Sequence, residues 1–272
     1  MGAYLKASAI AISIPFLNWV FLVLAGFVQL KTVSVGTAEA VRAATEAPLN
    51  IGLAQAAGVA VLFLVAFPHR SRSEGFLDAV HVKPLVGGVV LVCFAAGLLL
   101  QFPLAELGNM TQAIWPMSFD ELARRYQLLT PQNWWAGFSA LIAFVLIAPV
   151  TEEIVFRGWL MPMLGDRYGR TAGLIGSSVL FGLVHIEPSA VIYATVAGFV
   201  LGVVAMRAKS TLASIALHAG VNATPLLLPV TLVRIPGFNT LTERVEHIAP
   251  WLVAAALIGT GALLMLFWRA TE

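Results

Sequence analysis

Long apolar stretches separated by short polar breaks make up most of the chain. A run of about 20 apolar residues is long enough to cross the hydrocarbon core of a bilayer as a helix. The ten-residue alternation typical of a membrane β-barrel does not occur in the sequence. The pattern therefore predicts an all-α, polytopic integral membrane bundle that forms a single domain of about eight transmembrane helices. The predicted spans are residues 7–30, 51–67, 84–103, 137–163, 172–187, 190–206, 211–229 and 249–268.

The connection 104–136 carries a shorter amphipathic pattern of its own. Ser118 followed by Glu121 forms a capping box, which predicts the start of a helix, and Pro131 ends it. The apolar positions are Leu122, Tyr126 and Leu129, and the flanking tryptophans are Trp115, Trp134 and Trp135. Tryptophans favour the headgroup level of a membrane, so the segment predicts an interfacial helix. Its role is open between an anchor for the next span and a lid over a substrate entrance.

Composition supports a membrane protein and excludes other classes. The chain is 59% hydrophobic and 11% charged, with a mean hydropathy of +0.88, whereas a soluble domain is about 25% charged. A net charge of +2 without a long basic run gives no reason to expect a nucleic-acid partner. The single cysteine, Cys93, cannot form an internal disulfide. The first apolar run, 7–30, is too long for a signal peptide and is expected to be a span.

The distribution of lysine and arginine predicts an orientation. Eight spans put both termini on one side of the membrane, and nine basic residues fall on that side against six on the other. The nine are Lys6, Arg70, Arg72, Lys83, Arg167, Arg170, Arg207, Lys209 and Arg269. Because positive residues collect in cytoplasmic loops, this bias favours cytoplasmic termini. The compact, Gly- and Ala-rich chain without organelle signals favours a bacterial inner membrane.

Three polar groups interrupt the otherwise apolar spans. They are Glu152-Glu153-x-x-x-Arg157, Phe181-x-x-x-His185 and His218-x-x-x-Asn222. A charged side chain at the bilayer centre costs roughly 2.5–3.5 kcal/mol even on lenient scales, so such residues are expected to face each other inside the bundle. The rise per residue of a helix places all three groups at similar depths from the nearest loop. A shared functional site is therefore expected.

The two carboxylates of the first group are predicted to have different surroundings. Glu153 and Arg157 are four residues apart on a helix, which predicts an ion pair. Glu152 lies about 100° round the helix and is left without a local partner. A carboxylate in a low-dielectric interior suits a general base that works near neutral pH. The alternative is a buried polar cluster that only holds helices together.

The two histidine groups could complete a catalytic site. Phe181 lies one turn before His185 and is expected to pack against its ring on the same helix. His218 and Asn222 share a helix face, and two neutral donors there could stabilise an oxyanion. For either group alone, hydrogen bonding between helices is the alternative.

The chemistry that fits the three groups is amide hydrolysis without a covalent intermediate. Glu152 would take a proton from water, His185 would orient that water, and His218 with Asn222 would receive the charge on the carbonyl oxygen. The zinc motif H-E-x-x-H is absent, as are the G-x-S-G and G-x-G-D motifs of other membrane proteases.

These motifs, in this order on successive helices, resemble the CAAX prenyl endopeptidase and bacteriocin-processing family of intramembrane proteases, over residues 137–229. The resemblance implies a helical bundle with a conical cavity open toward one leaflet. It implies a glutamic-type peptidase with Glu152 as base, His185 at the water, and His218 and Asn222 as oxyanion donors. The supporting residues would be Glu153, Arg157 and Phe181. The substrate would be a membrane-associated or lipidated peptide or protein.

Several alternatives stay open at this point. No cofactor is expected, but a metal held by Glu152, His185 and His218 remains an alternative because members of the family were once considered metalloproteases. A non-enzymatic binding or immunity protein with the same fold is a second class of function. A proton-coupled transporter is a third, although the sequence has no internal repeat of the kind such carriers use. The substrate, its lipidation and the oligomeric state are not determined by the sequence.

Overall fold

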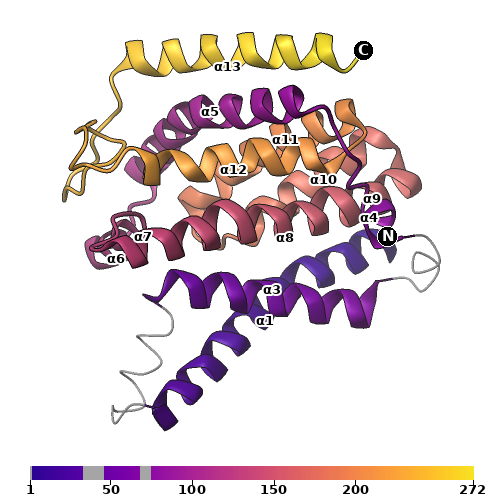
Figure 1. Cartoon of the computed structure of the whole chain (residues 1–272), viewed down its shortest axis with the longest axis horizontal. Coiled ribbons are helices and arrows are strands. Elements are labelled where there is room, and N and C mark those ends of the chain that lie inside the picture. Colours follow the sequence, from indigo (N-terminus) through magenta and orange to yellow (C-terminus); the bar gives the residue numbers. More distant parts are fainter. Residues whose placement is uncertain (1, 33–45, 68–74) are drawn as a thin grey trace.

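The computed structural model describes residues 2–32, 46–67 and 75–272, and these residues form helices and connecting loops without any strand. Helices occupy all eight of the predicted positions (Figure 1). Seven of these positions hold α1 (Gly2–Thr32), α3 (Pro48–Ala66), α5 (Gly87–Ile114), α10 (Arg170–Leu183), α11 (Pro188–Ala208), α12 (Thr211–Leu227) and α13 (Pro250–Ala270). The eighth position is a continuous composite helix over Trp134–Tyr168. The predicted all-α membrane bundle is confirmed.

The helices differ in whether they could cross a membrane alone. By length and composition, six of the described helices qualify, whereas α10 and α12 are shorter, with 14 and 17 residues. These two short helices lie among the longer ones and carry many buried residues (Figure 1). Both ends of the chain lie at the same end of the bundle, as eight helices require (Figure 1).

Two of the predicted boundaries that differ from the structure affect the site. Helix α5 was predicted to end at residue 103 but continues to Ile114, because its polar extension fastens the loop that follows α12. There the side chain of Asn109 donates to Gly237 O at 2.7 Å, and Glu106 accepts from the backbone N–H of Ile248 at 2.8 Å. Helix α10 ends at Leu183, so the predicted helix over 172–187 is too long at its carboxyl end.

The predicted short helix in the 104–136 connection is present as α6 (Phe119–Leu129). The hydroxyl of Ser118 accepts from the backbone N–H of Glu121 at 3.3 Å, as the capping box requires. A second short helix, α4 (Phe76–Ala79), precedes α5.

The composite helix Trp134–Tyr168 alternates between α- and π-helical turns. Its parts are α7 (Trp134–Ala140), η2 (Leu141–Ile147), α8 (Ala148–Val155), η3 (Phe156–Leu160) and α9 (Met161–Tyr168). A π-helical turn holds an extra residue, so it changes the direction of the side chains that follow, and such turns are frequent at functional sites. The two-glutamate motif lies in α8, between the two π-helical segments.

Helix α12 packs unusually closely against α5, and glycines make this possible. A Cβ atom added to Gly97 would lie 2.0 Å from the carbonyl oxygen of Leu217, and one added to Gly220 would lie 2.1 Å from that of Phe94. Small residues let membrane helices approach until their backbones touch. The contact fixes the position of His218, which lies between Leu217 and Gly220 on α12.

We expect Gly220→Ala to lower the free energy of unfolding by about 1–3 kcal/mol, because the new methyl group forces two backbones apart. Thermal unfolding of the purified protein in detergent measures the change. Gly261→Ala in α13 is the matched control, since a Cβ there has no neighbour within 4 Å. Equal unfolding temperatures for the two variants would contradict the close packing.

Candidate active site

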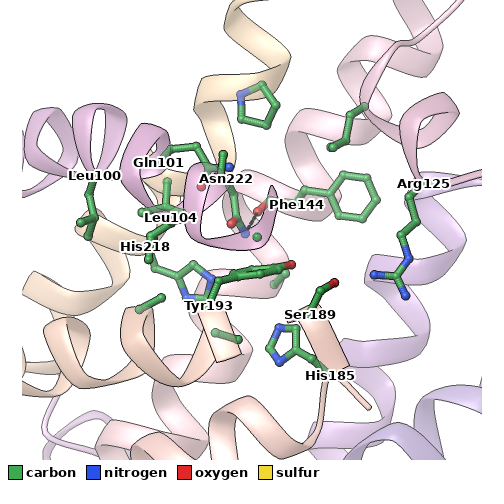
Figure 2. Close-up of a pocket in the computed structure, with 18 of the residues that line it drawn as sticks. Leu100, Gln101, Leu104, Arg125, Phe144, His185, Ser189, Tyr193, His218 and Asn222 are labelled. Atoms are coloured by element: carbon green, nitrogen blue, oxygen red, sulfur yellow. Dashed lines mark hydrogen bonds between the residues drawn. The ribbon is translucent and has the colours of Figure 1, made fainter. Parts of the chain in front are cut away.

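A cavity of about 590 Å³ lies inside the bundle (Figure 2). Its walls come from α3, α5, α6, η2, α8, α10, α11, α12 and the loop after α12. The predicted residues Glu152, His185, His218 and Asn222 all line it. The structure therefore brings the three polar groups of the sequence together at one site.

The ion pair expected from the sequence lies directly behind this cavity. Arg157 Nη1 is 2.9 Å from Glu153 Oε1, and both side chains are fully buried. The second terminal nitrogen of Arg157 donates to Gly198 O in α11 at 2.8 Å. The guanidinium carbon lies 4.5 Å from the centre of the Phe181 ring, so Phe181 stacks on the cation.

His218 joins this ion pair to the cavity. Its Nδ1 atom is 2.9 Å from Glu153 Oε1, and its Nε2 atom is 3.9 Å from Glu152 Oε2. Because Glu153 is a carboxylate paired with Arg157, it can only accept, so Nδ1 of His218 carries the hydrogen. The Nε2 atom therefore donates only when the ring carries both hydrogens and accepts when it carries one.

Glu152 has a partner that the sequence did not reveal. Gln55 Nε2 in α3 donates to Glu152 Oε1 at 2.9 Å and lies 3.0 Å from Thr151 Oγ1. The expectation that Glu152 lacks a partner on its own helix is right, but a distant helix supplies one. A single amide in the otherwise apolar run 51–67 was the available signal, because polar side chains inside membrane helices usually have a partner or a function.

His185 lies in the turn between α10 and α11 rather than on a helix, which corrects the prediction. Its Nδ1 atom is 2.8 Å from Phe181 O, and its ring centre is 5.1 Å from that of Phe181. A carbonyl only accepts, so Nδ1 carries the hydrogen and Nε2 is left with a free lone pair. The ring is directed into the cavity (Figure 2). Ile186 follows in the left-handed region with φ 66° and turns the chain toward α11.

The Asn222 amide makes one hydrogen bond within the protein. Its Nδ2 atom donates to Phe144 O in η2 at 2.9 Å (Figure 2). An amide nitrogen has two hydrogens, so one stays available in the cavity.

Further polar side chains line the cavity that the sequence reasoning did not select. Gln101, Ser189 and Tyr193 are on the walls, together with Arg125 from α6 (Figure 2). Leu122 and Leu129 of α6 line it as well. Helix α6 therefore forms part of the cavity wall.

The ligand set considered for a metal is not assembled. Among residues 2–32, 46–67 and 75–272, no three His, Cys, Asp or Glu side chains converge as possible ligands of one ion. Glu153 is held by Arg157 and His218, so it is not free to join Glu152.

Comparison with known proteins identifies the segment that carries this site. Residues 133–224 match the family described as Type II CAAX prenyl endopeptidase Rce1-like. This segment is therefore similar to the CAAX prenyl endopeptidase family. The matched segment contains all four cavity residues predicted to be catalytic and the Glu153–Arg157 pair.

A curated relative extends the similarity beyond this family domain. The chain is 26% identical to CAAX prenyl protease 2 of Rattus norvegicus over 216 residues, which is 79% of this chain. The aligned region covers 60% of that relative, so this chain spans less than two thirds of its length. No solved structure is significantly similar to the chain.

We expect Arg157→Leu to destabilise the protein by about 3–5 kcal/mol, because it leaves the Glu153 carboxylate buried without its cation. Thermal unfolding in detergent measures the loss. Arg124→Leu is the control: Arg124 pairs with Glu121 on the exposed side of α6, where an ion pair contributes about 0–1 kcal/mol. An Arg157 variant as stable as the control would contradict the cost of leaving Glu153 buried without its cation.

Proposed function

We propose that the protein is an intramembrane endopeptidase of the glutamic type, in which Glu152 activates a water molecule. The observation that carries the proposal is the convergence of Glu152, His185, His218 and Asn222 on one cavity inside the bundle. The similarity of residues 133–224 to the CAAX prenyl endopeptidase family supports peptide-bond hydrolysis as the reaction.

The first step is the activation of water. Glu152 accepts a proton from the water, while its other oxygen is held by Gln55 at 2.9 Å. The Nε2 lone pair of His185 accepts a hydrogen bond from the second O–H of the water. This hydrogen bond orients the water oxygen toward the substrate carbonyl. Since Phe181 O holds Nδ1 of His185, the ring cannot rotate away without losing a hydrogen bond.

The second step is the stabilisation of the tetrahedral intermediate. The remaining N–H of Asn222 and the Nε2–H of doubly protonated His218 donate to the oxyanion. Glu153 fixes the ring of His218 from behind, at 2.9 Å. Glu152 then returns its proton to the leaving amine, so the peptide bond breaks without a covalent intermediate.

The surroundings of the site support a membrane-associated substrate. A cavity of about 590 Å³ accommodates a short peptide segment but not a folded domain. The matched relative carries the name CAAX prenyl protease 2, so a lipidated peptide or protein is the substrate class that we propose here. The bias of lysine and arginine supports cytoplasmic termini.

Glu152→Gln should lower turnover by about 10²–10⁴-fold, because glutamine keeps the shape but cannot take the proton. Membrane proteins and released peptides of the host are compared by mass spectrometry between the wild type and the variant at equal expression. Glu272→Gln, which alters an exposed carboxylate at the end of the chain, is the control.

A fragment that vanishes only with Glu152→Gln would name the substrate and the cleaved bond. Retained turnover would contradict the role of Glu152 as base. An unchanged fragment pattern, with biological activity intact, would favour the binding or immunity function. If Glu152→Gln left the fragments unchanged but abolished ion-coupled uptake in a transport assay, the transporter function would be favoured.

Asn222→Ala should lower kcat by about 10²–10³-fold with little change in KM, because the oxyanion forms only after substrate binds. The cleavage kinetics of the identified peptide measure both constants. A rise in KM with kcat unchanged would indicate that Asn222 binds substrate and does not stabilise the oxyanion.

A further inference from the structure

A second cavity, of about 330 Å³, lies at the end of the bundle where both termini are found (Figure 1). The α9–α10 turn, the α11–α12 turn and the segment after α4 form it. It shares no lining residue with the candidate active site. Its function is therefore a separate question from the proposed proteolysis.

The lining of this second cavity is basic. Lys83, Arg170 and Lys209 contribute three formal positive charges and Asp166 one negative charge, and His81 is also on the wall. Within the part of the chain that the structure describes, none of these side chains makes a hydrogen bond or an ion pair. Three cations that converge on one hollow without an internal partner leave an excess of positive charge for an external anion.

The backbone at two of these residues adopts a conformation that favours glycine. His81 has φ 57° and Lys209 has φ 50°, and they are two of the three non-glycine residues with positive φ in the described chain. Lys209 follows the last turn of α11, a position where glycine is the usual residue. The chain thus keeps ionisable side chains at two positions where conformation alone would select glycine.

Hydrogen bonds hold the segment that bears His81 and Lys83 against α12. The backbone N–H of Thr211 donates to His81 O at 2.8 Å, and the hydroxyl of Ser210 donates to Lys83 O at 2.7 Å. The segment that bears His81 and Lys83 is therefore held in place by hydrogen bonds to the start of α12.

Helix α10 adds backbone donors at the same place. It begins at Arg170 on the wall of the cavity, and no side chain caps it. The N–H groups of a first helical turn carry partial positive charge and bind anions. The side-chain cations and the helix start thus favour the same kind of ligand.

We propose that this cavity binds a phosphate group, supplied either by the headgroup of an anionic phospholipid or by free phosphate in the adjoining aqueous phase. Basic pockets between the ends of membrane helices suit anionic headgroups. The compact volume suits a headgroup or a phosphate ion, because an acyl chain would stay outside among the helices.

The test uses the purified full-length protein in a non-ionic detergent and three probes. These are short-chain phosphatidylglycerol, short-chain phosphatidylcholine as the zwitterionic comparison, and inorganic phosphate. Binding is followed by the shift of the thermal unfolding temperature and by native mass spectrometry. We expect phosphatidylglycerol or phosphate to raise the unfolding temperature of the wild type in a saturable way, with phosphatidylcholine much less effective.

The variants remove the cations one at a time and together. Lys83→Gln, Arg170→Gln and Lys209→Asn should each weaken the apparent Kd about fivefold, the value expected for one basic residue near a membrane surface. Asparagine tolerates the left-handed conformation at residue 209. Arg269→Gln is the matched control, since Arg269 is an exposed cation near the end of α13 that does not line the cavity.

The outcomes separate the two sources and can overturn the proposal. Saturable binding of phosphatidylglycerol alone assigns the site to a lipid, and binding of inorganic phosphate alone assigns it to the soluble ion. Equal responses to phosphatidylglycerol and phosphatidylcholine, or cavity variants that bind like Arg269→Gln, would overturn it. If Lys83→Gln or Lys209→Asn fails to fold, Arg170→Gln decides the matter, because Arg170 is exposed and makes no internal contact through its charge.

Discussion

The buried pair of Glu153 and Arg157 is the interaction on which the arrangement of the site depends. Arg157 reaches Glu153 on its own helix, the backbone of Gly198 in α11, and the ring of Phe181 in α10. Glu153 in turn holds His218 in α12. One guanidinium and one carboxylate thereby connect four helical segments, in a region where an unpaired charge would be very costly. The neighbours of each charge are fixed because both side chains are fully buried.

The short lengths of α10 and α12 also shape the site. Helices α10 and α12 are the shortest of the bundle helices, with 14 and 17 residues, and both lie among longer ones. Because α10 ends early, His185 can lie in a turn with its ring in the cavity. The tight contact at Gly97 and Gly220 brings α12 close to α5. The early end of α10 thus leaves room for the cavity that His185 lines.

Sequence reasoning succeeded where the relevant contacts are local. The spacing of Glu153 and Arg157 predicts their ion pair, and the spacing of Phe181 and His185 predicts the ring contact, because both pairs lie within one turn of the chain. It failed where the partner comes from a distant segment. Gln55 is 97 residues away from Glu152, and its hydrogen bond exists only because α3 packs beside α8. The extension of α5 past residue 103 has the same cause, since the loop after α12 satisfies its polar residues.

The role of the buried pair is better understood as positional than as stabilising. Apolar side chains of similar volume would fill the same space at no greater cost, because a buried ion pair rarely repays its desolvation. Apolar residues, however, could not accept the Nδ1 hydrogen of His218, and the ring would lose the bond that directs Nε2 toward Glu152. The buried pair therefore holds His218 so that its Nε2 atom lies 3.9 Å from Glu152, the carboxylate that is proposed to act as base.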